Sequence, residues 1–199
     1  MVSGMISSLD SAEARVRANA ARYIGDYALS DPDAIKALQK LCELALEDED
    51  RVVRREATRA IGRVLEADLK DRKSELDEII VYDDLTYMSF SLREYVYLVL
   101  DRVLRNDMSE EVRSTAAYAL GFADPSNYQD AVSILIRALR DVDWDVRSCA
   151  AHSLGKIGDH SVFGELARLA FDPTETKGAA LSAFLAMREI TRRMCGLGS

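Results

Sequence analysis

The residues from 141 to 159, DVDWDVRSCAAHSLGKIGD, bring together the side chains that metal sites and active sites use. Cys149 and His152 are three residues apart, so on a helix they share one face, and several carboxylates precede them. A thiolate and an imidazole on one face could touch a single metal ion. A zinc site needs three or four ligands, however, and no second pair of ligands stands nearby in the sequence. The sequence therefore predicts no metal site here.

Enzyme motifs give no stronger signal elsewhere in the chain. The sequence contains no G-x-S-x-G motif, no Walker A motif and no dinucleotide fingerprint. Its two histidines, His152 and His160, leave little scope for acid–base catalysis. We therefore predict a protein that is not an enzyme, with no catalytic residue and no cofactor.

Composition restricts the class of partner. The 26 Lys and Arg residues are outnumbered by 34 Asp and Glu residues, so the net charge of −8 repels phosphate backbones and predicts no nucleic-acid partner. Three cysteines without C-x-x-C spacing suit reduced thiols rather than a disulfide framework. No apolar run approaches the roughly 18 residues of a membrane span, and the N-terminus lacks the pattern of a signal peptide. We expect a cytoplasmic protein with no membrane partner.

A repeated pattern explains the odd composition of residues 141 to 159. Four copies align without a gap: VRANAARYIG from Val16, VRREATRAIG from Val53, VRSTAAYALG from Val112 and VRSCAAHSLG from Val146. A weaker fifth copy, TKGAALSAFL, is predicted to start at Thr176. The spacing of the copies is that of a helical hairpin repeat, with extra chain inside the second unit.

Each copy predicts an amphipathic helix. Val, Ala and Ile or Leu recur at i, i+4 and i+8, which places them in one stripe on the helix face that forms the core. The alanine is small because a neighbouring helix must approach closely there. The glycine that follows suits a left-handed residue that ends the helix. We predict each copy to be the first helix of a hairpin, followed by a second helix at 34–46, about 92–104, 131–139 or 162–170.

The acidic turn followed by Val-Arg, Ala-Ala and Leu-Gly resembles HEAT repeats, most closely the short HEAT-like repeats of phycobilisome (bilin) lyases. The resemblance extends from about Leu9 to Arg193 and implies an all-α, right-handed α-solenoid of about five helical hairpins. It implies one domain over residues 1–199, with a lengthened, irregular second repeat at about 48–106. It also implies a structural ladder between neighbouring repeats, in which four arginines pair with acids of the preceding turns: Arg17, Arg54, Arg113 and Arg147 with Asp10, Asp50, Asp107 and Asp143.

Solenoids of this kind serve mainly as binding surfaces. The expected function is therefore a non-catalytic scaffold or adaptor that binds a protein or peptide on a concave face lined by the second helices. Helical phase places four candidate contact residues on that face, namely Arg93, Tyr97, Arg137 and Arg140.

Two departures from the repeat provide further candidates. The long second unit contains a segment rich in aromatic residues, with Tyr87 and Phe90 at its predicted tip. These aromatics either anchor a partner or fill the core where the stack is interrupted. Trp144 lies two residues before the valine of its repeat, in a column that requires no large apolar group, and is a secondary anchor candidate.

A second function follows from the family resemblance. A bilin lyase or chaperone-like subunit would need arginines for the propionates of a linear tetrapyrrole and aromatic side chains beside its rings. The sequence offers Arg93, Tyr97 and Arg102 for this role. The iron-binding His-Glu dipeptides of HEAT-type hydroxylases are missing, because both histidines are followed by serine. A HEAT-type DNA glycosylase would require a basic groove, which the acidic composition does not favour.

Overall fold

The computed structural model describes residues 2–27, 33–71, 80–83, 88–123 and 128–196. The chain divides into two compact units, Met1–Asp107 and Met108–Ser199, where the sequence predicts one domain. Each unit is described by itself below.

The first unit begins with the short helix α1 (Val2–Ile6) and a 3-10 turn, η1 (Ser7–Asp10). The long helices α2 (Ala14–Tyr27), α3 (Ala34–Glu47), α4 (Arg51–Asp71) and α5 (Leu92–Asn106) follow. An antiparallel hairpin, β1 (Ile80–Asp83) and β2 (Met88–Ser91), lies between α4 and α5 in the lengthened repeat and was not predicted. Ser91 and Glu94 form a capping box that starts α5.

The second unit contains α6 (Glu110–Ala119) with its 3-10 extension η3 (Leu120–Phe122), and α7 (Tyr128–Ala138). These are followed by α8 (Trp144–Ile157), η4 (His160–Val162), α9 (Phe163–Ala170) and α10 (Lys177–Met194). The predicted all-α class is confirmed, with the β1–β2 hairpin as an addition within the described residues. Among those residues, no helix is both long enough and apolar enough to cross a lipid bilayer.

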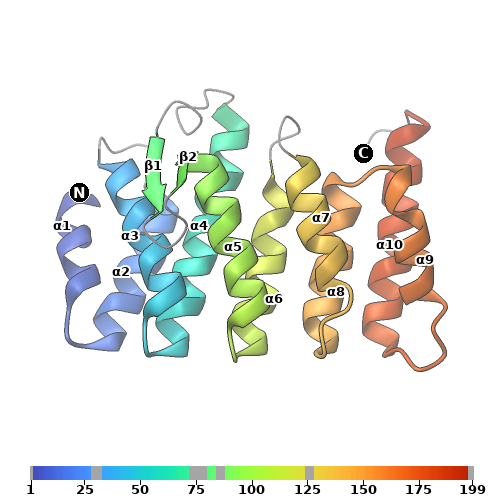
Figure 1. Ribbon diagram of the computed structural model, residues 1–199, viewed down its shortest axis with the longest axis horizontal. Coiled ribbons are helices and arrows are strands. Elements are labelled where there is room, and N and C mark those ends of the chain that lie inside the picture. Colours follow the sequence, from blue (N-terminus) through green and yellow to red (C-terminus); the bar gives the residue numbers. More distant parts are fainter. Residues whose placement is uncertain (1, 28–32, 72–79, 84–87, 124–127, 197–199) are drawn as a thin grey trace. The chain divides into compact units, whose positions relative to one another are not determined.

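The helices that carry the repeated pattern, α2, α4, α6, α8 and α10, are called the pattern helices, and their positions are counted from the valine as position 1. Helix α3 packs against α4, α7 against α8 and α9 against α10 (Figure 1). Short turns join the two helices of these pairs. Each of these pattern helices is therefore the second helix of its hairpin, and the predicted assignment as the first helix is wrong. The pattern determines which face is buried, but it does not determine which neighbouring helix completes the pair.

The predicted core stripe is confirmed in both units. Positions 1, 5 and 9 are fully buried in α4, α6 and α8, and in α2 only Val16 at position 1 is partly exposed. Pattern helices also pack on one another, α2 on α4 in the first unit and α6 on α8 on α10 in the second. The alanine at position 5 is thus buried where helices approach closely, as expected from its size.

The glycines at position 10 have a different role from the predicted one. Gly25 and Gly155 lie within helices, and among the described glycines only Gly196 has a positive φ. A Cβ atom added to Gly155 would lie 2.9 Å from the Cα atom of Ala186 on α10. A Cβ atom on Gly25 would lie 2.7 Å from the Cα atom of Ala60 on α4. These glycines therefore allow two pattern helices to touch, and the predicted helix-ending role is wrong.

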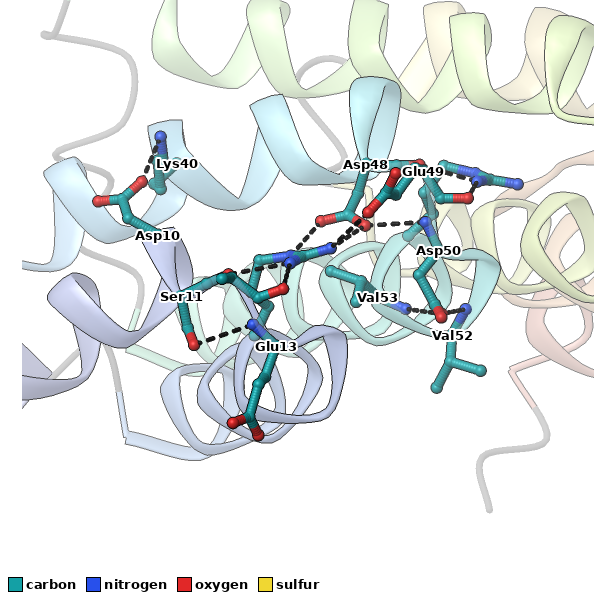
Figure 2. Close-up of polar contacts among 12 residues, drawn as sticks. Asp10, Ser11, Glu13, Lys40, Asp48, Glu49, Asp50, Val52 and Val53 are labelled. Atoms are coloured by element: carbon teal, nitrogen blue, oxygen red, sulfur yellow. Dashed lines mark hydrogen bonds and ion pairs between the residues drawn. The ribbon is translucent and has the colours of Figure 1, made fainter.

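The repeated arginine at position 2 holds each pattern helix to the turn of the next hairpin. Arg17 donates from Nε and Nη2 to the carboxylate of Asp48 at 2.7 and 2.9 Å, and from Nη1 to the carbonyl oxygens of Ser11 and Ala12 at 2.9 and 3.1 Å. Figure 2 shows Asp48 and Ser11 at this contact. Arg147 repeats the arrangement with Glu175, at 2.7 and 2.6 Å, and with the carbonyls of its own turn. Such bidentate bonds are directional as well as strong.

The ladder exists, but most of its predicted acids are wrong. Besides Arg17–Asp48 and Arg147–Glu175, the pairs are Arg54–Asp107 and Arg113–Asp141. Of the predicted acids, only Asp107 is used. Asp50 and Asp143 instead accept backbone N–H bonds at the start of α4 and α8, and Asp10 pairs with Lys40. Two acids two residues apart have different tasks, because the first meets the arginine and the second caps the helix.

Helix capping also corrects the register of the last pattern helix. The cap Asp143 accepts a bond from the N–H of Val146, and the cap Thr176 accepts one from the N–H of Ala179. Ala179 is fully buried and therefore occupies position 1 of α10. The fifth copy thus starts three residues later than the predicted Thr176.

The ladder makes stability depend on pH at acid values. The hydrogen bond from Arg147 lowers the pKa of Glu175 from its ordinary value of 4.5, against the opposing effect of burial. A carboxyl whose pKa is depressed by folding stabilises the protein fully above its unfolded pKa, and this stabilisation is lost as the pH falls through the folded pKa. We expect the difference in thermal midpoint between wild type and Arg147→Ala to shrink as the pH is lowered below about 4.5. A difference that stays constant over that range would contradict this assignment.

Candidate functional site

A pocket of about 500 Å³ lies between two pattern helices of the second unit. We call it the α8–α10 pocket. Its walls are formed by residues of those two helices: His152, Gly155, Lys156, Ser182, Leu185, Ala186, Arg188, Glu189 and Arg193.

The repeat positions the side chains at this pocket. Position 7 of the pattern helices points to solvent and holds Tyr118 in α6, His152 in α8 and Leu185 in α10. Position 11 lies one turn further on and holds Phe122, Lys156 and Glu189. Below them, Gly155 meets Ala186, and the hydroxyls of Ser148 and Ser182 are 2.8 Å apart. The helices touch through small residues, and the larger side chains of positions 7 and 11 therefore stand above the contact as the rim.

Aromatic rings restrict the positions of the side chains on the α8 side of the rim. The rings of Tyr118 and His152 are stacked, with centroids 6.0 Å apart and planes 7° from parallel. Tyr118 also meets the edge of Phe122, with centroids 5.4 Å apart. The ammonium of Lys156 lies 4.4 Å from the centroid of Tyr118 and 4.3 Å from that of Phe122. Cation–π attraction to two rings restricts the position of this charge.

His152 contributes an uncharged ring to this arrangement at neutral pH. Burial lowers its pKa below the ordinary 6.5, and the nearby charge of Lys156 lowers it further. The neutral imidazole can stack on Tyr118 and offer one donor and one acceptor.

The α10 side of the rim is charged. Arg193 donates to the backbone carbonyl oxygens of Lys156 and of Gly158, the latter at 2.6 Å, and so caps the end of α8. Glu189 pairs with Arg192 at 3.6 Å. Arg188 occupies position 10, where the other pattern helices have glycine, and its side chain is exposed.

Two predicted binding residues are not on the surface. Arg93 is 0% exposed and Tyr97 is 3% exposed, so the expectation that they lie on an open binding face is wrong. Helix α5 buries a wide arc that runs from Leu92 to Leu104, and a helical phase with one buried stripe therefore misplaces them. The tetrapyrrole site predicted from Arg93, Tyr97 and Arg102 loses two of its three residues for the same reason.

The other predicted residues are dispersed. Arg137 and Arg140 are exposed on and after α7, and Arg140 lies 3.4 Å from Glu165. Trp144 is 47% exposed in the first turn of α8, with its ring against Gly178 of α10. Tyr87 lies outside the described residues. Phe90 lies in β2, but its side chain is not among those described. The contact role of these residues stays a prediction.

The Cys149 thiol lies in surroundings that keep it protonated. Burial raises the pKa of the Cys149 thiol to about 11, with further contributions from Asp145 and Asp143. A thiol with such a pKa is protonated at neutral pH and is a poor nucleophile. Within the part of the chain that the structure describes, no three His, Cys, Asp or Glu side chains are grouped for a metal ion.

The sequence contained a signal for the pocket residues. The residue at position 7 is mostly polar and differs between copies, which is typical of an exposed position. His152 and Tyr118 both occupy this position. Leu185 could not be placed at position 7, and Arg188 could not be placed at position 10, because the predicted register of the last copy was three residues off.

Comparisons with known proteins agree with this architecture. The family model for HEAT repeats matches residues 2–85 and 99–184. No curated protein matches the sequence. Among solved structures, an engineered protein is 22% identical, with a TM-score of 0.63 over 95% of this chain and 78% of that one.

Two natural proteins have a similar fold. The complex of CpcE and CpcF of phycocyanin lyase from Nostoc sp. PCC7120 is 15% identical, with a TM-score of 0.62 over 94% of this chain and 97% of that one. Kap121p is 14% identical, with a TM-score of 0.60 over 96% of this chain and 18% of that one. At these identities the likeness concerns the fold. The predicted resemblance is confirmed, and with a family model that matches more than half of its residues the chain belongs to the HEAT-repeat family.

Proposed function

We propose that this HEAT-repeat protein is a non-catalytic interaction module that binds a segment of a partner protein in the α8–α10 pocket. The observation that carries the proposal is the pocket's composition. An exposed Leu185 lines a hollow between two helices beside cationic side chains, and the exposed Tyr118 stacks on the pocket residue His152. Tyr and Arg are typical of the centres of protein interfaces, where an apolar body buries area and a polar end selects the partner.

The proposed binding face lies on the pattern helices, and not on the helices that follow the pattern in the sequence. The sequence placed contacts on the helices that follow the pattern, whereas the pocket is lined by the pattern helices α8 and α10. The proposal is non-catalytic because three of the ionisable groups of the pocket have structural partners. Lys156 is held over two rings, Arg193 caps α8, and the neutral His152 is stacked on Tyr118.

A variant of Leu185 tests this function. Peptides selected from a random displayed library against the wild-type protein should bind the Leu185→Glu variant at least about tenfold more weakly, because a carboxylate replaces the apolar contact at the pocket. Affinities would be measured by fluorescence anisotropy. Leu185 is 38% exposed, so the variant should retain its helical circular dichroism and its thermal midpoint.

Phe171→Ser is the matched control. Phe171 is a larger and more exposed apolar residue in the turn after α9, and it does not line the pocket. Selected peptides should bind this variant as tightly as wild type. Peptides that lose affinity for Phe171→Ser but not for Leu185→Glu would place the binding surface elsewhere and refute the proposal.

A further inference from the structure

The charge of the α8–α10 pocket is opposite to the charge of the whole chain. Its charged lining residues are Lys156, Arg188, Arg193 and Glu189, three cations and one anion, whereas the protein carries −8. An acidic protein repels acidic partners at long range, so a cationic hollow on its surface gives local specificity rather than general attraction. This contrast indicates that the occupant of the pocket carries a negative charge.

Two of these cations are held in place by the fold. Lys156 lines the pocket, and its ammonium is held over the rings of Tyr118 and Phe122, on the α6 side of α8. Arg193 is held by the carbonyl oxygens at the end of α8, which neutralise none of its formal charge. Charges that are already positioned lose little side-chain entropy when a ligand arrives, and they therefore favour binding more than mobile surface lysines do.

Arg188 is the third cation and is available to a ligand. The neighbouring Glu189 pairs with Arg192, and among the described residues no carboxylate pairs with Arg188. It stands at position 10 of α10, one helical turn after the apolar side chain of Leu185. A guanidinium at this spacing can form a bidentate pair with a carboxylate whose neighbour lies on Leu185.

The floor of the pocket is apolar. It consists of Gly155 and Ala186, which are buried at the helix contact, with Leu185 beside them. We propose that the occupant is an acidic segment of a partner protein, in which one large apolar residue packs on Leu185 and Ala186 and an adjacent Asp or Glu side chain pairs with Arg188. This inference rests on the proposed function and adds the chemistry of the partner.

Synthetic peptides of defined charge test this inference. The probes are a fluorescent peptide of Glu and Asp with two leucines, the same peptide with both leucines replaced by serine, and its Lys and Arg counterpart. We expect the acidic leucine peptide to bind, the serine form to bind at least about tenfold more weakly, and the basic counterpart not to bind. Binding should weaken as salt is raised, because exposed charges are screened. Equal or tighter binding of the basic peptide would overturn the inference.

Charge reversal at Arg188 locates the contact. Arg188→Glu should weaken binding of the acidic leucine peptide at least about tenfold. Arg15→Glu, an equal reversal of an exposed arginine on α2, should leave it unchanged. If both variants weakened binding equally, the net charge of the protein would explain the effect and the inference would be overturned. Binding of a single-stranded oligonucleotide that Arg188→Glu abolishes would also overturn it, in favour of a nucleic-acid site.

The two proposals fail in different ways. If the library peptides depend on Leu185 but are neutral or basic, the interaction site is supported and the inference of an acidic partner is wrong. Library peptides that do not depend on Leu185 would remove the site itself.

Discussion

Replacing Gly155 by leucine is expected to lower the free energy of unfolding by about 3 kcal/mol, the upper part of the range for overpacked cores. The Cβ atom alone would lie 2.9 Å from the Cα and 3.0 Å from the Cβ atom of Ala186. Because the first of these atoms is backbone, no rotamer change of a flexible side chain can make room. Helices α8 and α10 would have to separate, which would expose the apolar contact along both.

Gly164→Leu is the matched control for this prediction. Gly164 lies in α9, and a Cβ atom built there has no neighbour within 4 Å. Leucine has a higher helix propensity than glycine, so this variant should be as stable as wild type or more stable by up to about 1 kcal/mol. Chemical denaturation monitored by circular dichroism gives both values. Equal midpoints for the two variants would show that Gly155 is not a contact between helices.

Arg147→Ala is expected to cost about 2 to 3 kcal/mol of unfolding free energy, somewhat less than the loss of one partner from a fully buried ion pair. The Glu175 side chain is only 6% exposed and would lose both bonds from the guanidinium. It would keep its bonds from the backbone N–H and the hydroxyl of Thr176, which limits the loss. The carbonyl oxygens of Asp141 and Val142 would also lose a donor.

Arg168→Ala removes an arginine from a pair of similar length. Arg168 Nη1 lies 2.6 Å from Glu165, but the arginine side chain is 64% exposed. Exposed pairs contribute little, so this variant should differ from wild type by less than about 1 kcal/mol. Urea denaturation of the three proteins would measure both effects. A loss for Arg168→Ala as large as that for Arg147→Ala would contradict the ladder's role.

The helix faces could be predicted from the sequence because burial follows directly from periodicity. Val146, Ala150 and Leu154 are spaced for one stripe, and all three are fully buried. The pairing of helices could not be predicted in this way, since an amphipathic helix presents the same stripe to a neighbour on either side. Turn length contained part of the missing information, for the α3–α4 pair. Only residues 48–50 separate α3 from α4, and such a short turn brings consecutive helices directly together.

The roles of single residues depended on neighbours that are distant in the sequence. A glycine near a helix end has two physical explanations, a positive φ or a close approach, and only the position of Ala186 distinguishes them for Gly155. The same holds for the acids. Asp48 and Asp50 are the same residue type in the same turn. Only the three-dimensional path of the turn shows that Arg17 pairs with Asp48.

The candidate site could be predicted less well than the fold. Arg93 is buried because α5 is covered on several sides. A prediction that assigns one buried face and one exposed face to each helix cannot foresee this. The polar column at position 7 was visible, yet a single column does not reveal that two helices leave a hollow beside it. That hollow depends on Gly155 and Ala186, which are small and apolar and carry no chemical signal of their own.

The small residues on the pattern helices also determine which segments could be duplicated in evolution. On α8, positions 3, 6 and 10 are Ser148, Ala151 and Gly155. A helix like α8, with Ser153 at its contact, already packs on Gly121, the equivalent glycine in η3. A gene duplication of the α7–α8 hairpin would therefore create matching surfaces at once. On α10 the same positions are Leu181, Phe184 and Arg188, all exposed and too large for that approach. A tandem copy of the α9–α10 hairpin would have to change all three before it could stack on its own parent.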